Sequence, residues 1–206
     1  METTQNPVSD SYSSIPVTAC GLYKEKGSRF LSWAFPVESE AAVKGILAGV
    51  KKEYHDARHH CYAYRTGFRG DCWRANDDGE PSSSAGRPIL GQIDSRGLSD
   101  VLVVVVRYFG GIKLGIPGLI KAYRTAAAEA LDKAGRIEKI AGRWFSVHFD
   151  YAAMNAVMSL LKDLDLEQRA QDFGERCSLE VRVRLSAEQV FKDRLSLLAG
   201  CRWNER

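Results

Sequence analysis

The segment VVVVRYFGGIKLGIPGLIKAYR, residues 103–124, contains the pattern that decides the fold of this chain. Its opening run of four valines predicts a central strand that is buried on both faces. A glycine-rich turn at 110–118 follows, and then a helix in which Pro117 suits the first turn and Gly135 the C-terminal stop. The small side chains of 126–128 would let this helix lie close to a sheet.

The residues before this segment predict strands and one amphipathic helix. Apolar residues between Val43 and Tyr54 recur at the spacing of one helix face, which predicts a helix over residues 39–54 with Ser39 as its N-cap. Strands are predicted at residues 17–23, 29–35, 58–66 and 72–75, and a polar, irregular loop is predicted at 76–84.

The composition changes after about residue 140, since 15 of the 18 glycines lie before that point. The later part reads β-α-β-β-α, the order of a ferredoxin-like unit, and a further strand has room only near Trp203. Residues 186–189, Ser-Ala-Glu-Gln, predict a capping box for the last helix. We therefore expect an α+β protein with a flexible tail at 1–14, an N-terminal domain at 15–140 and a ferredoxin-like domain at 141–206.

The composition limits the classes of protein. The chain of 206 residues has 29 Lys and Arg against 26 Asp and Glu, a basic excess that allows an anionic partner without requiring one. Five cysteines, none in a Cys-x-x-Cys pair, predict neither a disulfide framework nor a zinc site, and free thiols fit a reducing cytoplasm. The start has no signal-peptide pattern and the longest apolar run is too short to span a bilayer, so we expect a cytoplasmic protein without a membrane partner.

The signatures of P-loop hydrolases, dinucleotide-binding proteins, zinc proteases and α/β-hydrolases are absent from the sequence. We therefore assign no catalytic residue, metal ligand or cofactor. A non-enzymatic protein is favoured, while an unfamiliar enzyme stays open.

The loop NDDGEPSSSAGRPIL, residues 76–90, carries three carboxylates that would repel one another without cationic partners: Asp77, Asp78 and Glu80. We expect Arg87 or Arg74 to supply the positive charge, in a structural loop held by arginine and backbone donors. A magnesium or calcium site is the alternative. The histidines of HHCYAYR, residues 59–65, point to opposite faces of a strand, which favours packing roles over a shared ligand.

The glycine-rich turn is the candidate site for an anion or nucleic acid. Such a turn exposes backbone N–H groups, and the helix dipole adds positive potential. Two alternatives are a plain connection and an inward Arg107 paired with Asp77 or Asp78. The expected site residues are Arg107, Gly110, Gly111, Lys113, Gly115, Lys121 and Arg124. A possible second surface on the C-terminal sheet comprises His148, Arg182 and Arg184.

Three motifs resemble the IMPACT family, especially its YigZ-like bacterial members: DDGEPSSSAGRPIL (77–90), RYFGGIKLG (107–115) and AYRTAAAEAL (122–131). The resemblance implies an N-terminal domain like the second domain of a small-subunit ribosomal protein. It also implies a C-terminal domain like the end of elongation factor G. Eukaryotic relatives act in translational control through an additional N-terminal domain that recognises an activator of an initiation-factor kinase. We see no counterpart of that domain and do not expect the kinase role here.

Two positions depart from the family pattern. Ser83-Ser84 replaces the usual Gly-Thr, and residues 116–119, Ile-Pro-Gly-Leu, replace Ala-Gly-Gly-Leu. Pro117 removes a backbone donor from the helix start.

Three functions follow from these features. The favoured one is a non-enzymatic RNA- or ribosome-associated protein with a role in translation or its regulation. The second is a protein-binding regulator without nucleic acid, and the third is an enzyme acting on a small phosphorylated substrate. The sequence does not name the RNA, the protein partner or the oligomeric state.

Overall fold

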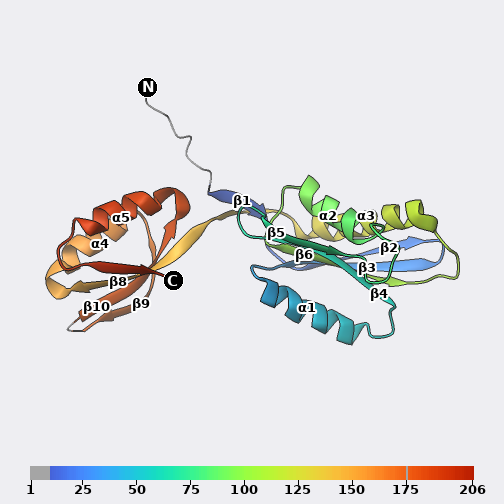
Figure 1. The fold of residues 1–206 in the computed structure, drawn as a ribbon, viewed down its shortest axis with the longest axis horizontal. Coiled ribbons are helices and arrows are strands. Elements are labelled where there is room, and N and C mark those ends of the chain that lie inside the picture. The colour runs from blue at the N-terminus through green and yellow to red at the C-terminus, as the bar shows by residue number, and fades with distance from the viewer. Residues whose placement is uncertain (1–9, 175) are drawn as a thin grey trace, which may run out of the picture. The chain divides into compact units, whose positions relative to one another are not determined.

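The structure is a computed structural model that describes residues 10–174 and 176–206. These residues form two compact units: residues 12–139 make the first, and residues 140–206 join residues 10 and 11 in the second. Both units combine helices with antiparallel sheets, which confirms the α+β class (Figure 1). Among the described residues, no helix has the length and apolar character needed to cross a membrane.

A five-stranded antiparallel sheet in the order β2-β3-β6-β4-β5 forms the centre of the first unit. The predicted central strand is the middle strand β6, and every residue from Val101 to Arg107 is buried. The strands are β2 (Ala19–Glu25), β3 (Ser28–Pro36), β4 (His59–Thr66), β5 (Cys72–Asn76) and β6 (Val101–Tyr108).

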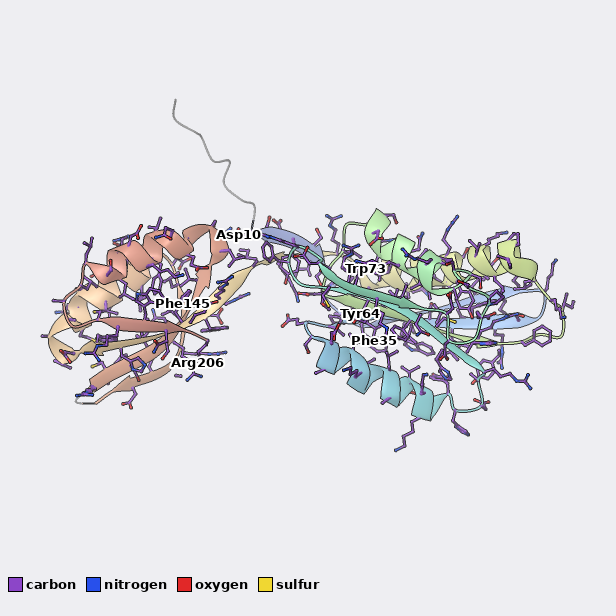
Figure 2. All side chains as sticks on the ribbon, viewed as in Figure 1. Asp10, Phe35, Tyr64, Trp73, Phe145 and Arg206 are labelled. Carbon is purple, nitrogen blue, oxygen red and sulfur yellow. The ribbon has the colours of Figure 1, made fainter. Side chains whose placement is uncertain are left out.

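Helices cover both faces of this sheet, which explains why β6 has no polar face. Helix α1 (Glu40–Glu53) packs on one face over Leu102, Val104 and Val106, while Figure 2 shows Phe35 and Tyr64 on the same side. Helices α2 (Gly86–Ser95) and α3 (Gly115–Ala134) pack on the other face. Ser39 caps α1 as expected, since its hydroxyl accepts a hydrogen bond from the amide of Ala42 at 3.2 Å.

Three elements of the first unit were not anticipated. Helix α2 follows the acidic loop directly, and β1 (Ser11–Ser14) pairs with β7 (Ile137–Ile140) in a small separate sheet. The expected flexible tail at 1–14 is therefore wrong for residues 10–14, while residues 1–9 lie outside the described residues. Residues 11–14, Ser-Tyr-Ser-Ser, resembled a polar tail because their sheet partner is more than 120 residues away in sequence.

The second unit has the element order β-α-β-β-α-β and the strand order β11-β8-β10-β9, the arrangement of a ferredoxin-like unit. Both helices pack against the face that carries Phe145, Val147, Leu179 and Val181 (Figure 2 labels Phe145). Its elements are β8 (Gly142–Asp150), α4 (Met154–Asp163), β9 (Glu167–Phe173), β10 (Arg176–Arg184), α5 (Glu188–Ser196) and β11 (Arg202–Glu205), with 3₁₀ turns η1 (Tyr151–Ala153) and η2 (Leu185–Ala187). The finer likeness to a ribosomal-protein domain and to elongation factor G stays a prediction.

The expected capping box at residues 186–189 is wrong. Helix α5 begins at Glu188 and has no side-chain cap. The hydroxyl and the amide of Ser186 both donate to the carboxylate of Asp10, which also pairs with Arg184 at 2.9 Å. The segment that precedes the first unit in sequence thus supplies a buried carboxylate to the second unit.

Candidate functional site

A buried polar network lies beneath one end of the five-stranded sheet. The guanidinium of Arg107 donates to Glu80 Oε1 through Nη1 at 2.7 Å, and the hydroxyl of Tyr123 donates to the same oxygen at 2.7 Å. The Cys61 thiol lies 3.3 Å from the Tyr123 hydroxyl oxygen. Burial is the main cause that raises the pKa of Tyr123 and of Cys61 far above their ordinary values, so both side chains stay neutral.

Arg107 is held in one position and keeps an unused donor. Its side chain is only 8% exposed, and its guanidinium lies between two rings, 5.5 Å from the centroid of Phe30 and 5.6 Å from that of Phe109. The Nε atom is buried and has no hydrogen-bond partner among the described residues. Leaving such a donor without an acceptor costs about 1–3 kcal/mol, and because Nε has almost no accessible surface, a ligand would meet the other atoms of the guanidinium.

The glycine-rich turn packs against the β2–β3 hairpin at Gly110 and leads into helix α3 at Gly115. A Cβ on Gly110 would lie 1.9 Å from the carbonyl carbon of Gly27, and the Gly110 amide donates to Ser28 Oγ at 3.2 Å. Gly110 was expected to donate to an anion, and this expectation is wrong because its amide is already used. Gly111 and Gly115 have φ angles of 88° and 71°, in the left-handed region that glycine tolerates.

Helix α3 begins at Gly115, two residues before the expected start, and no side chain caps it. The first amides of an α-helix have no partner within the helix, and they carry the positive end of its dipole. The amides of Gly115 and Ile116 belong to this first turn, and both residues line the same cavity as Arg107. Pro117 lacks an amide hydrogen.

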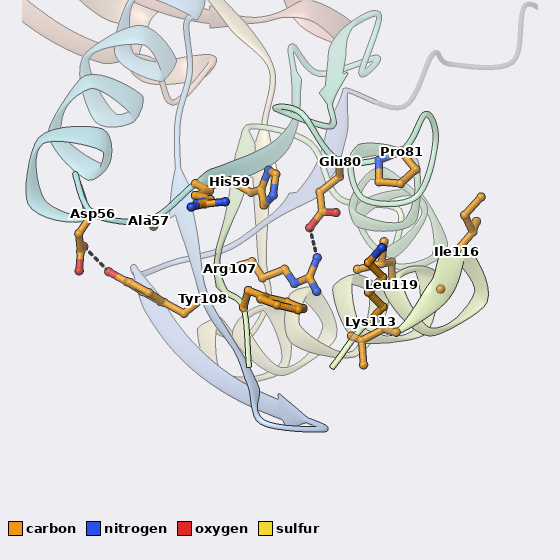
Figure 3. Close-up of a pocket in the computed structure, with 14 residues that line it drawn as sticks. Asp56, Ala57, His59, Glu80, Pro81, Arg107, Tyr108, Lys113, Ile116 and Leu119 are labelled. Atoms are coloured by element: carbon orange, nitrogen blue, oxygen red, sulfur yellow. Dashed lines mark hydrogen bonds and ion pairs between the residues drawn. The ribbon is translucent and has the colours of Figure 1, made fainter. Parts of the chain in front are cut away.

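A cavity of about 630 Å³ joins these features (Figure 3). Arg107 and Glu80 line it together with Lys113 and the start of α3, and the segment 56–59 forms another part of its wall. His59 lies directly opposite Arg107 in the β4–β6 register. Its Nδ1 is 3.0 Å from the carbonyl oxygen of Asp78, which can only accept, so Nδ1 carries the hydrogen and Nε2 is an acceptor in the neutral ring.

The charges around the cavity are not balanced within it. Its two carboxylates have partners, because Glu80 holds Arg107 and Asp56 accepts a hydrogen bond from the hydroxyl of Tyr108 at 2.7 Å. That bond lowers the pKa of Asp56 and raises the pKa of Tyr108. Within residues 10–174 and 176–206, the cavity residues Arg58 and Lys113 form no ion pair. The three cations of the lining thus exceed its two carboxylates by one positive charge, and Arg58 and Lys113 are the cations that an anion could pair with.

The acidic loop is structural, but its partners differ from those expected. Asp77 accepts from the amides of Ser83, Ala85 and Gly86 and so anchors the start of α2. Asp78 accepts from the amide of His60 and pairs with Lys51. The expected pairing of this loop with Arg74 or Arg87 is therefore wrong, because the sequence could not show that Lys51 and Arg107 lie beside it.

Arg87 instead stacks on an aromatic ring, and its Cζ lies 5.3 Å from the centroid of Trp73. The expected pairing of Arg107 with Asp77 or Asp78 is also wrong, since Glu80 is its partner. Among the described residues, no cluster of His, Cys, Asp and Glu is arranged to hold a metal ion.

Two of the expected site residues lie outside the cavity. Lys121 and Arg124 are exposed on α3, and Arg124 lines a separate hollow with Arg87 and Ser83. Their places one and two turns into the helix put them on other sides of α3 than the residues at its start. Arg107, Lys113, Gly115 and the turn thus come together, while Lys121 and Arg124 do not join them.

The possible second surface is only partly assembled. His148 and Arg182 are exposed on the sheet face opposite the helices, and His148 lines a hollow with Arg176 and Arg202. Arg184 instead pairs with the buried Asp10. The hydrogen bond from Arg184 is the main cause that holds the pKa of Asp10 well below its usual range, which gives Arg184 a structural role.

Sequence reasoning missed the wall formed by Asp56, Arg58 and His59. The sequence showed only a basic residue, Arg58, directly before a predicted strand. Its place beside the cavity follows from the pairing register of β4 with β6, which the sequence does not give. The aromatic side chains of Tyr108 and Phe109 also line the cavity.

The fold and the cavity define a small α+β protein with a partly apolar, cationic pocket at the start of a long helix. Residues 26–131 match the family model described as the Impact N-terminal domain. The chain is 33% identical to the IMPACT family member YvyE of Bacillus subtilis over 84% of its own length and 80% of that protein. It is also 33% identical to the IMPACT family member YigZ of Escherichia coli, over 85% and 87% of the two chains.

A crystal structure titled as that of a hypothetical protein superposes with a TM-score of 0.73 at 28% sequence identity, and covers 95% of this chain and 97% of the other. The chain therefore belongs to the IMPACT family.

Proposed function

We propose that this chain is a non-enzymatic RNA- or ribosome-associated protein, with a role in translation or its regulation, and that it binds phosphate groups at the cavity beside α3. The observation that carries the proposal is the pair of cations without ion pairs, Arg58 and Lys113, beside the fixed guanidinium of Arg107 in one cavity. An uncapped helix start adds positive potential at the same place. The translational role of eukaryotic IMPACT proteins agrees with an RNA-directed function, although it does not transfer the kinase pathway.

Salt-dependent binding tests this proposal. Fluorescence anisotropy would follow a labelled single-stranded RNA of mixed sequence across a salt series, for the unchanged chain and for the variants Arg58→Ala and Lys113→Ala. Each lost phosphate contact should weaken binding and make the plot of log K against log salt shallower by about 0.7. Both side chains are exposed and unpaired, so the fold should stay intact.

Lys121→Ala and Arg124→Ala are the matched controls, because they remove the same charge from α3 outside the cavity. They should leave the affinity and the salt dependence nearly unchanged. Equal losses in all four variants would indicate diffuse attraction to a basic surface and would contradict a site at the cavity. Unchanged binding in the two cavity variants would also contradict it.

A protein-binding regulator is the second candidate, and exposed apolar side chains in and beside the cavity favour it. Phe109 and Ile116 line the cavity and are 57% and 53% exposed, and Ile112 in the glycine-rich turn between them is 55% exposed. Exposed apolar side chains grouped around a pocket are typical of protein contacts. Substituting Ile112→Ser should abolish capture of a protein partner and leave RNA affinity unchanged if this second function holds.

A further inference from the structure

The cavity has more room and more apolar wall than a backbone phosphate requires. Its volume of about 630 Å³ lies within the range of sites that enclose small molecules. Beside the cations, it is lined by Pro81, Leu114, Ile116 and Leu119, and by the rings of Tyr108 and Phe109. A ligand that fills this space would match the lining with an anionic group and with a body that packs against the aliphatic side chains and the two rings.

The depth of Arg107 indicates which end of such a ligand enters first. Its side chain is 8% exposed and is fixed by Glu80, so the anionic group must come to it. A phosphodiester within a strand continues on both sides and meets side chains at an open surface. A phosphate that reaches the inner wall of a cavity can be attached to the rest of the ligand on one side only. A terminal phosphate meets this condition.

The charge at the cavity agrees with a terminal phosphate. A phosphomonoester carries between about −1.5 and −2 charges near pH 7, whereas a diester carries a single charge. Arg58 and Lys113 are the two cavity cations that have no ion pair among the described residues, and with Asp56 counted they leave one excess positive charge, which attracts a phosphomonoester more strongly than a diester. Amides at the start of α3 add donors suited to phosphate oxygens.

We infer that the cavity binds a nucleotide through its phosphomonoester, with the base against the aromatic and aliphatic wall. This inference deepens the proposed function and rests on it. The same chemistry is present in the phosphorylated end of an RNA strand and in a free nucleoside monophosphate, and the experiment separates the two sources.

The test compares one short RNA sequence in four forms: with a 5′-phosphate, with a 3′-phosphate, with hydroxyls at both ends, and circularised. An internal fluorophore reports binding, and the four nucleoside monophosphates serve as unlabelled competitors and as ligands in calorimetry. A phosphorylated end should increase affinity about tenfold over the hydroxyl-ended and circular forms. Lys113→Ala and Arg58→Ala should remove that difference, and Lys121→Ala should retain it.

The outcomes separate the inference from the proposed function. Tight binding of a phosphorylated end with weak competition by monophosphates supports an RNA end. Tight binding of a free monophosphate that displaces every RNA form supports a free nucleotide. Equal binding of all four RNA forms, still dependent on Lys113, would overturn the inference and uphold phosphate-directed RNA binding. No binding of any RNA or nucleotide would overturn both.

Discussion

The pair of Arg107 and Glu80 shows how single residues serve both the core and the cavity. A buried charge needs a partner, and here the partner comes from a loop 27 residues away in sequence. Tyr123 adds a second donor to Glu80, so that the carboxylate is fixed from two sides. The arginine that we assign to ligand binding is therefore also a structural residue of the first unit.

Removing one member of this pair should cost far more than removing both. Glu80→Leu leaves Arg107 buried without its partner, and we expect a loss of about 3–5 kcal/mol in the free energy of unfolding. Arg107→Met should cost a similar amount, because it leaves the Glu80 carboxylate buried without its cationic partner. The double variant should lose less free energy of unfolding than either single variant, as measured by urea denaturation. Additive losses would show that the two side chains do not interact.

Ser83 adopts a backbone conformation that glycine prefers, with a φ angle of 61°. The family usually has glycine at this position, so the departure seen in the sequence has a structural cost. We expect Ser83→Gly to raise the free energy of unfolding by about 0.5–1 kcal/mol, because relief of left-handed strain exceeds the added flexibility of the unfolded chain. Calorimetric melting would measure the gain. Ser82→Gly, at a neighbour without a positive φ, should give no gain.

Contacts with the β2–β3 hairpin determine which residues the glycine-rich turn can contain. The β2–β3 hairpin approaches the end of β6 so closely that Gly110 has no room for a side chain. The hydrogen bond from Gly110 to Ser28 Oγ then joins the turn to β3. The turn thus keeps Phe109 and Lys113 in place beside the cavity.

Gly110→Ala should therefore be among the most damaging single substitutions in the first unit. The new Cβ would overlap the backbone of Gly27, and we expect a loss above about 4 kcal/mol or failure to fold. Gly49→Ala is the control, because no atom lies within 4 Å of its added Cβ in α1. Alanine in that helix should stabilise by up to about 1 kcal/mol. Normal thermal stability of Gly110→Ala would contradict the close approach.

The division into two units is a property of the whole molecule, and the second unit depends on a residue from the start of the chain. Asp10 is buried, and its carboxylate accepts hydrogen bonds from the side chains of Arg184 and Ser186. We propose that the two units fold as separate domains, with a boundary near residues 138–143, where limited proteolysis should release two stable fragments.

Loss of the Asp10 carboxylate should destabilise the second unit selectively. Asp10→Asn removes charge-assisted hydrogen bonds and should cost about 1.5–3 kcal/mol. Because its pKa is lowered in the folded state, the stabilisation is fully present above the ordinary Asp pKa of about 4 and is lost progressively as the pH falls from there through the folded-state pKa. Denaturation of the unchanged chain and the variant at pH 7 and pH 3 would measure this, and the difference between their stabilities should be smaller at pH 3 than at pH 7. Asp172→Asn, an exposed change on β9, is the control.

Local patterns in the sequence determined the elements whose contacts are local. The valine run, the capped helix α1 and the alternating strands of the second unit follow from side-chain periodicity, and the motifs identified the family. The sequence also predicted that Arg107 and Lys113 lie close together, because a glycine-rich turn before a helix is a local feature, and both line the same cavity.

Only the tertiary structure decided which groups meet. Arg107 pairs with Glu80 and not with Asp77 or Asp78. Ser186 donates to Asp10 and takes no part in a capping box. The register of β4 with β6 brings Arg58 and His59 to the cavity. It also places Lys121 and Arg124 away from that cavity. Such pairings depend on strand register and on the approach of segments far apart in the chain, and residue spacing along one sequence does not encode those distances.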